Sequence, residues 1–134
     1  MNKGLAGAPP ETIEAASDTA MNRAVLNAFA LAISGAEGPP AFPGIPGHEP
    51  DIVTARQHVR AVGDAMAPLR EVVSSVGSYV AEADYFEKAW QQSFWGPNYP
   101  RLLAVKDKYN PDGLFIVHHG VGSERWIDDG SVRI

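Results

Sequence analysis

A stretch rich in proline and glycine, residues 38–50, most constrains how this chain can fold. It reads Gly-Pro-Pro-Ala-Phe-Pro-Gly-Ile-Pro-Gly-His-Glu-Pro and holds five prolines and three glycines in thirteen residues. Proline has no amide hydrogen for a helix or sheet ladder, and glycine loses the most backbone entropy when it is ordered. We therefore expect an irregular surface crossing, held to the body of the protein by Phe42 and Ile45, between two helical segments.

Apolar spacing predicts one helix on each side of this crossing. The first is expected to begin at residues 17–18 and to end near Gly35. The second is expected to begin at residues 50–51, with Pro68 kinking or dividing it. Its apolar residues follow steps of seven, three, four, three and four, which predicts a buried stripe. That stripe consists of Ile52, Val59, Val62, Met66, Leu69 and Val73.

Composition excludes several classes of function and leaves a single domain as the default. The chain has 134 residues, enough to bury one core. Its net charge of −5 argues against nucleic acids and anionic membranes, because both attract basic surfaces. No apolar run approaches the roughly 20 residues that a membrane span needs. Because cysteine is absent, disulfides and thiolate metal ligands are excluded.

The N-terminal residues 1–16 are rich in glycine, alanine and proline, and we expect them to be mobile or weakly helical. Lys3 is not followed by the apolar stretch that signal peptides contain. We therefore expect a soluble chain, with the cytoplasm as the default location.

Aromatic side chains are concentrated between residues 79 and 126. This stretch holds all three Trp, all four Tyr and three of the five Phe residues in about a third of the chain. We expect any functional site to lie here.

The secondary structure expected in this region is a succession of short elements. Alternation at residues 78–83 is typical of a strand. Asp84 and Glu87 match the capping box of a helix that runs to about Phe94, and Gly96-Pro97 interrupts it.

Three more elements follow. Asn98 is placed to cap a second helix with Pro100 in its first turn. Asn-Pro-Asp-Gly at residues 110–113 predicts a tight turn, and the apolar run at 114–118 predicts a second short strand. The pattern therefore predicts a mostly helical α+β fold.

The same succession resembles a known family. Trp-Gly-x-Asn-Tyr-x-Arg-Leu followed by Val-Lys-x-Lys-Tyr-Asn-Pro-Asp-Gly-Leu-Phe resembles the C-terminal signature of berberine-bridge-enzyme-like flavoproteins, which are FAD-linked oxidases of the vanillyl-alcohol-oxidase superfamily. The tail at residues 119–126 is similar to the ending of a microbial branch of that family. The signature residues here are Trp95, Gly96, Asn98, Tyr99, Arg101, Leu102 and the run Val105 to Phe115.

The resemblance implies a division of the chain. Residues 1–16 would be a mobile N-terminal segment, 17–77 the helical part of a substrate domain, and 78–134 the berberine-bridge-like C-terminal segment. In the family, an upstream domain holds FAD, whereas this chain has no Gly-x-Gly-x-x-Gly motif after a strand. The resemblance therefore implies that FAD binds only together with that missing domain, and that this polypeptide alone oxidises nothing.

Three residues are candidates for roles in such an enzyme. The resemblance places Asn98 and Tyr99 near the flavin ring, where a side-chain amide binds the polar pyrimidine edge. The alternative is a helix cap for Asn98 and a core aromatic for Tyr99. In plant members the strand at 78–83 carries Asn-Tyr, with the Tyr as base, but here it reads Ala81-Glu82. Glu82 in a buried cavity would have a raised pKa and accept the substrate proton; the alternative is a solvated strand residue.

Other polar residues in the region favour simpler interpretations. His118 and His119, adjacent on a strand, would point to opposite faces, so we expect no metal site there. Arg101, Lys106 and Lys108 either contact flavin phosphates or form ion pairs on the helix surface, and the acidic composition favours the second interpretation.

Two functions remain open at this stage. One is an FAD-dependent oxidase in which this segment supplies a wall of the substrate cavity and contacts to the flavin ring, while hydride passes from a small organic substrate to the flavin. The other is a non-catalytic structural or interaction remnant of the same fold. The expected partner is a flavin-binding half of the enzyme, or a second copy of the chain through an exposed apolar face.

Overall fold

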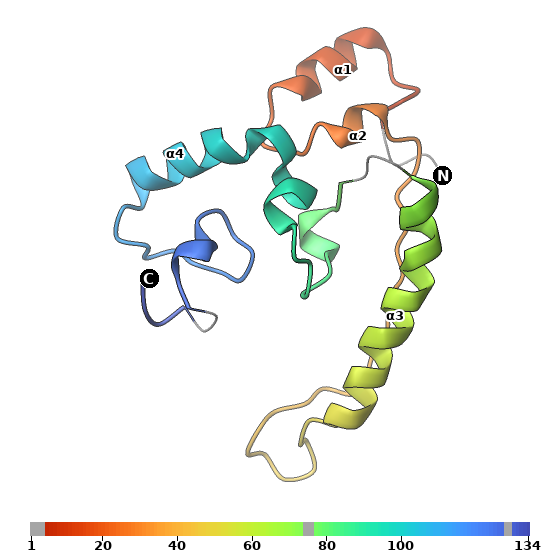
Figure 1. Ribbon diagram of the computed structural model, residues 1–134, viewed down its shortest axis with the longest axis vertical. Coiled ribbons are helices and arrows are strands. Elements are labelled where there is room, and N and C mark those ends of the chain that lie inside the picture. Colours follow the sequence, from red (N-terminus) through yellow and green to blue (C-terminus); the bar gives the residue numbers. More distant parts are fainter. Residues whose placement is uncertain (1–4, 74–76, 128–129) are drawn as a thin grey trace. The chain divides into compact units, whose positions relative to one another are not determined.

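The computed structural model describes residues 5–73, 77–127 and 130–134, and helices joined by irregular segments make up this part of the chain (Figure 1). The mostly helical character expected from the sequence is confirmed. No sheet forms among these residues, and their only β pairing is an isolated antiparallel bridge between Trp126 and Arg133. The chain forms two compact units, which are described separately: a larger unit, Met1–Leu31 with Ser75–Ile134, and a smaller unit, Ala32–Ser74.

The N-terminal part of the larger unit contains two short helices. α1 spans Pro10–Ser17, with proline at its first position, where a missing amide hydrogen costs nothing. α2 spans Ala24–Asn27. The single helix expected from residues 17–18 to Gly35 is therefore wrong. The chain turns extended at Ala28, and Phe29 is 77% exposed, so the apolar face that would have stabilised a longer helix is not buried.

The smaller unit contains α3, Ile52–Val72, the longest helix of the described residues. Its predicted start is confirmed, because Asp51 accepts a hydrogen bond from the Thr54 amide. Pro68 lies within the helix and does not divide it. The expectation of a buried stripe is wrong: no residue of α3 is buried. The irregular crossing at 38–50 is confirmed as lacking helix and strand, but Phe42 and Ile45 are exposed rather than anchored.

Residues 77–95 differ most from the expected elements. In place of a strand at 78–83, residues Val80–Glu82 form the 3₁₀ turn η1, closed by a bond from the Glu82 amide to the Tyr79 carbonyl. The expected capping box is also wrong. The Asp84 carboxylate accepts from the Phe86 amide, and the Glu87 carboxylate accepts from the Ala89 amide. Each carboxylate therefore closes a local turn, a use of Asp and Glu that competes with helix formation.

A π-helical turn, η2 (Gln91–Trp95), follows and leads into η3 (Gly96–Asn98) and α4 (Tyr99–Tyr109). Gly96 ends η2 with a φ of +52°, so the predicted interruption at Gly96-Pro97 is confirmed. The core of the larger unit is small. Among its described residues, the buried apolar side chains are Trp90, 7% exposed, and Phe94, 4% exposed.

The last part of the chain is held by turns. The predicted turn at residues 110–113 is confirmed by a bond from the Gly113 amide to the Asn110 carbonyl. The second strand, expected at 114–118, is not formed, because this stretch finds no partner strand among the described residues. η4 (Ser123–Arg125) then brings back Trp126, whose ring lies against Gly113. No helix in the described part of the chain is long and apolar enough to span a bilayer.

Candidate functional site

Seven rings in the larger unit form an aromatic cluster, and four of them are stacked in a row. Tyr85 stacks on His118 with ring centroids 4.0 Å apart, and His118 stacks on His119 at 3.7 Å. His119 stacks in turn on Trp90 at 5.3 Å. Phe86, Phe94 and Tyr99 meet the edges of this row. We call these seven residues the aromatic cluster: Tyr85, Phe86, Trp90, Phe94, Tyr99, His118 and His119.

The cluster is buried at one end and exposed at the other. Trp90 and Phe94 belong to the core, whereas Tyr85 is 61% and Phe86 59% exposed. Aromatic rings of this size bury much of the apolar surface in a small protein, so exposure at one end leaves a substantial part of that contribution unused. The exposed end is therefore a candidate contact surface.

The expectation that the side chains of His118 and His119 point to opposite faces is wrong. Because residues 114–118 form no strand and His119 has a φ of +56°, the two rings lie on the same side and stack. A ring nitrogen of His118 also lies 2.8 Å from the Tyr85 carbonyl oxygen. Burial, and then the neighbouring His118, lower the pKa of His119 below its ordinary value of 6.5. Among the described residues no group of three or more His, Cys, Asp or Glu could hold a metal ion.

Asn98 is buried, with 6% of its surface exposed, and its amide is committed to the backbone of the N-terminal part. Its side-chain nitrogen donates to the carbonyl oxygens of Thr19, at 3.2 Å, and Met21, at 2.7 Å. Asn98 stands at the N-cap position of α4, as the cap interpretation expects, but its side chain makes no cap bond. A buried amide with two partners is a strong positional constraint, and here it joins residues 77 and 79 positions apart.

Tyr99 forms part of the aromatic cluster with its ring and holds the C-terminal tail with its hydroxyl. The hydroxyl donates to the Glu124 carboxylate at 2.6 Å and accepts from the Gly122 amide at 3.1 Å. Burial, followed by the bond to Glu124, raises the pKa of the Tyr99 hydroxyl above its ordinary value of 10.0. The alternative interpretation of Tyr99 as a core aromatic therefore accounts for its ring but not for the hydrogen bonds of its hydroxyl.

Glu82 lies in η1 and is exposed. It is not among the residues that line the apolar cavity beside Lys106. The described residues leave Glu82 exposed rather than enclosed in a buried cavity, and its role as a base stays a prediction.

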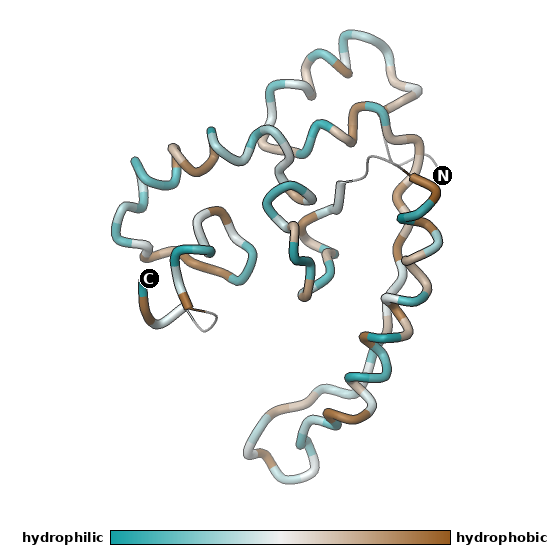
Figure 2. Tube along the Cα trace, viewed as in Figure 1, coloured by the Kyte–Doolittle hydropathy of each residue, from teal (hydrophilic) through white to brown (hydrophobic). Residues whose placement is uncertain are grey.

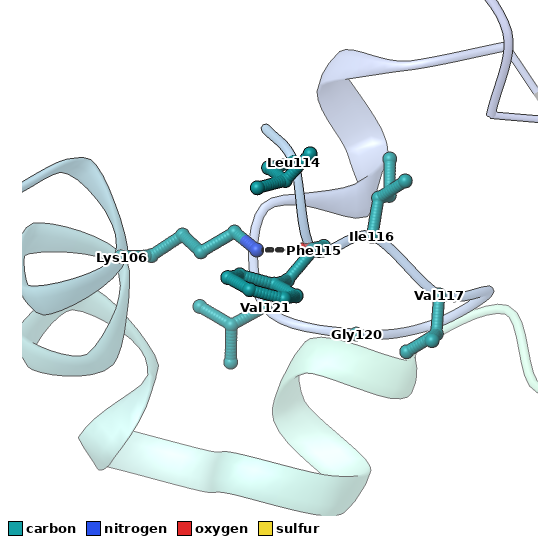
Figure 3. A pocket seen from close by; sticks show the side chains of 7 residues that line it. All are labelled: Lys106, Leu114, Phe115, Ile116, Val117, Gly120 and Val121. Atoms are coloured by element: carbon teal, nitrogen blue, oxygen red, sulfur yellow. Dashed lines mark hydrogen bonds between the residues drawn. The ribbon is translucent and has the colours of Figure 1, made fainter. Parts of the chain in front are cut away.

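The basic residues of α4 contact the protein's own backbone and rings. Arg101 donates to the Thr19 carbonyl at 3.0 Å, and Lys108 lies 5.1 Å from the centre of the Tyr109 ring. Lys106 donates to the Phe115 carbonyl at the edge of an apolar cavity of about 350 Å³ (Figure 3). The cavity is lined by Lys106, Leu114, Phe115, Ile116, Val117, Gly120 and Val121.

A flavin would need donors that point into free space, and the residues of this chain do not supply a complete set. The amide nitrogen of Asn98 and the hydroxyl of Tyr99 both have partners within the protein. The indole nitrogen of Trp95 is buried without a hydrogen-bond partner among the described residues. One orphaned donor among the described residues is not by itself a cradle for a dinucleotide.

The sequence analysis missed the residues that join the N-terminal part to the aromatic region. Asn22 donates from its side-chain nitrogen to the carbonyls of Gln92, at 3.1 Å, and Ser93, at 2.8 Å. These carbonyls belong to the π-helical turn, and they also accept from backbone amides, Gln92 from Gly96 and Ser93 from Ser78. A π-turn has no reliable sequence signature, and a lone Asn in a predicted helix gave no signal of a partner 70 residues away.

Part of the chain, which includes most of the aromatic region, matches a known protein family. Residues 78–122 match the family model described as "Berberine and berberine like". A VAO-type flavoprotein oxidase from Thermothelomyces thermophilus is 41% identical over 86 residues, which are 63% of this chain and 15% of that protein. An FAD-linked oxidoreductase from Hypocrea jecorina is 38% identical over 93 residues, which are 68% of this chain and 16% of that protein.

A shorter and more similar match comes from Malbranchea aurantiaca. Its FAD-linked oxidoreductase is 56% identical over 54 residues, which are 40% of this chain and 9% of that protein. This chain therefore spans 16% or less of the length of each of these three relatives. No solved structure matches the chain.

Proposed function

Because residues 78–122 are a segment of the berberine-bridge-like family, we propose that this chain serves as the C-terminal portion of an FAD-dependent oxidoreductase. In this proposal it supplies one wall of the substrate cavity and contacts to the flavin ring. The match of residues 78–122 to the family model is the observation that carries the proposal, and the similarity of the chain to relatives named FAD-linked oxidoreductases supports it.

The aromatic cluster supports this proposal. Tyr85 and Phe86, at the exposed end of the cluster, leave large apolar surfaces in water. Phe115, three residues before His118 in the sequence, is also exposed. Such surfaces cost free energy unless a partner covers them. We infer that the partner is a flavin-binding part, on the same polypeptide or on a second one, and that a small organic substrate lies between the two.

The proposal assigns no chemical step to this chain alone. FAD supplies the hydride-accepting chemistry in the proposed complete enzyme, and the flavin-binding part holds most of it. Asn98 and Tyr99 keep the segment ordered in the isolated chain, and in the complete enzyme they are proposed to lie near the flavin ring. Glu82 is proposed as the base that accepts the substrate proton.

Reconstitution tests the proposal. The chain should be produced together with the flavin-binding part encoded upstream of it, in the same or a separate reading frame, and purified by a tag on residue 134. A yellow complex that contains FAD and oxidises small alcohols or amines with dioxygen is expected. A colourless preparation would overturn the proposal and favour the alternative, a non-catalytic structural remnant of the same fold.

The role of Glu82 has its own test in that complex. Glu82→Gln removes the basic oxygen without changing the side-chain size, so the rate of flavin reduction by substrate is expected to fall by about a hundredfold or more. Glu71→Gln, at an exposed position of α3, is the matched control and should leave the rate unchanged. Equal rates in the two variants would remove Glu82 from the mechanism.

A further inference from the structure

A side chain far upstream in the sequence contacts the turn that leads into the family signature. Asn22 donates through its side-chain nitrogen to the carbonyls of Gln92 and Ser93. Its side-chain oxygen accepts from the Ala24 amide at 3.0 Å, which fixes the direction of the side chain. All of these residues belong to the larger unit. Asn22 lies outside residues 78–122, so the turn before the signature is held in part by a residue that the family match does not include.

The turn η2 lies between two hydrogen-bond registers. The Gly96 amide donates to the carbonyl five residues back, as in a π-helix, and to that of Gln92, four residues back, as in an α-helix. Pro97 has no amide hydrogen, so it cannot bond the Ser93 carbonyl in an α register or the Gln92 carbonyl in a π register. The two carbonyls that lose a helical partner to Pro97 are the two that Asn22 binds.

Two glycines leave room for Asn22. A Cβ on Gly77 would lie 2.7 Å from the side-chain nitrogen of Asn22, and a Cβ on Gly96 would lie 2.8 Å from its side-chain oxygen. In both joined segments, residues 17–23 and 88–98, hydrophilic and hydrophobic residues follow one another without a long hydrophobic run (Figure 2). Apolar burial is non-directional and tolerates a shift along such a segment, whereas two hydrogen bonds from one amide require a fixed geometry.

We propose that Asn22 is a positioning residue whose amide holds η2 in its π register. A change to the α register advances the chain after the turn by one helical position, a rotation of about 100° and a rise of about 1.5 Å. Asn98 and Tyr99 follow this turn directly. The bond from the Asn98 side chain to the Met21 carbonyl therefore depends on the observed register. So does the edge contact of the Tyr99 ring with Trp90, whose ring centroids are 5.5 Å apart.

Amide exchange in the isolated whole chain measures the effect of Asn22. Asn22→Asp keeps the size of the side chain and an acceptor oxygen but removes both donor bonds. Exchange at Gly96 should accelerate by about tenfold or more, and the NMR signals of the Tyr99 ring should move as its edge contact changes. Asn27→Asp makes the same change at the exposed last position of α2 and should alter neither. Equal effects of the two variants would overturn the proposal.

Pro97→Ala supplies the missing amide and separates a register effect from general destabilisation. In Pro97→Ala alone, Asn22 still binds both carbonyls, so the new amide at position 97 should exchange freely. When Asn22→Asp is added, the new amide should bond the Ser93 carbonyl as in an α-helix and exchange about tenfold or more slowly. The double variant should also unfold at a higher temperature than Asn22→Asp alone. Equal exchange of the new amide in the two backgrounds would overturn the proposal, even if Asn22→Asp by itself did not fold.

The reconstituted complex tests what the register means for the flavin, a consequence that rests on the proposed function. Asn98 and Tyr99 are the proposed flavin contacts, so Asn22→Asp should shift the visible absorption maxima of the yellow complex, and Asn27→Asp should not. Unshifted maxima in a yellow Asn22→Asp complex would remove this consequence. A colourless complex of the unaltered chain would count against the proposed function instead, because exchange in the isolated chain alone decides whether Asn22 holds η2.

Discussion

His119 is the residue whose ionisation most directly affects the aromatic cluster. Its ring lies between those of His118 and Trp90, and burial followed by the charge of His118 lowers its pKa. The carboxylates of Asp84 and Glu87 oppose that shift. Protonation of His119 therefore introduces a charge into a partly buried row of rings, where burial disfavours the charged form.

The pH dependence follows from the direction of this shift. The unfolded chain, with the ordinary His pKa of 6.5, binds the proton more readily than the folded chain. The stabilisation by His119 is therefore complete above pH 6.5 and is lost as the pH falls below it toward the lowered folded pKa. We expect amide exchange in residues 118–122 to accelerate between pH 7 and pH 5, as measured by hydrogen–deuterium exchange corrected for intrinsic rates.

Two substitutions separate this effect from general acid sensitivity. His119→Gln cannot be protonated and should lose the acceleration in this range. His48→Gln, in the smaller unit, should retain it. An unchanged pH profile in His119→Gln would show that another group causes the opening.

Sequence reasoning at this scale found the important residues but not their contacts. The family signature selected Asn98 and Tyr99, and both are central in the larger unit. Their partners, at Thr19, Met21 and Glu124, lie 25 to 79 residues away, and no local pattern encodes such pairings. The capping signal placed Asn98 correctly at the N-cap of α4 but gave no indication of the two distant carbonyls to which its side-chain nitrogen donates.

At the scale of elements, the Tyr99 hydroxyl joins α4 to η4. It binds both Glu124 and the Gly122 amide, so Tyr99→Phe leaves a carboxylate and an amide without this partner. We expect a loss of stability of about 1 kcal/mol and faster amide exchange at Gly122. Thermal unfolding and exchange measurements check the two effects. Tyr109→Phe, at a 73% exposed position of the same helix, should change neither.

The same hydroxyl should give an alkaline signature. Its pKa is higher in the folded chain than in the unfolded chain, so its contribution to stability is complete below pH 10 and is lost at higher pH. In an ultraviolet titration of the folded chain, one of the four tyrosines should ionise late. Tyr99→Phe should remove that late step, and its persistence would assign the step to another tyrosine.

Elements whose signals are local could be predicted from the sequence. The start of α3 at Asp51, the break at Gly96 and the turn at 110–113 all depend on residues within a few positions of one another, and all three are confirmed. The strands at 78–83 and 114–118 depended on partner strands, and the described residues provide none. A strand without a partner leaves its amides unpaired, so local turns replace it.

At the scale of the whole molecule, two parts of the chain separated by more than 40 residues make one unit. Residues 1–31 join 75–134, with the smaller unit inserted between them. The side-chain bonds that cross this junction come from Asn22, Asn98 and Arg101. An apolar pattern predicts which faces are buried but not which distant segment buries them. The apolar stripe predicted for α3 shows the other limit of such patterns, because no residue of that helix is buried.

Cutting the chain tests whether the junction holds without the covalent link. A specific protease site inserted between Gly44 and Ile45, in the irregular crossing, allows one cleavage. We expect the two pieces to stay together on size-exclusion chromatography.

Asn98→Asp replaces a buried donor with a carboxylate facing two carbonyl oxygens, and each lost bond costs about 1–3 kcal/mol. Association of the pieces should therefore weaken by at least about tenfold.

Asn110→Asp is the matched control for this experiment, since it makes the same chemical change at a bond that stays within the C-terminal piece. The Asn110 side chain donates to the Phe115 carbonyl at 3.1 Å, and both residues belong to the C-terminal piece. The cleaved Asn110→Asp chain should remain associated under conditions in which the cleaved Asn98→Asp chain separates. Equal behaviour of the two variants would mean that other contacts join residues 1–31 to 75–134, and that Asn98 is free to serve a different partner.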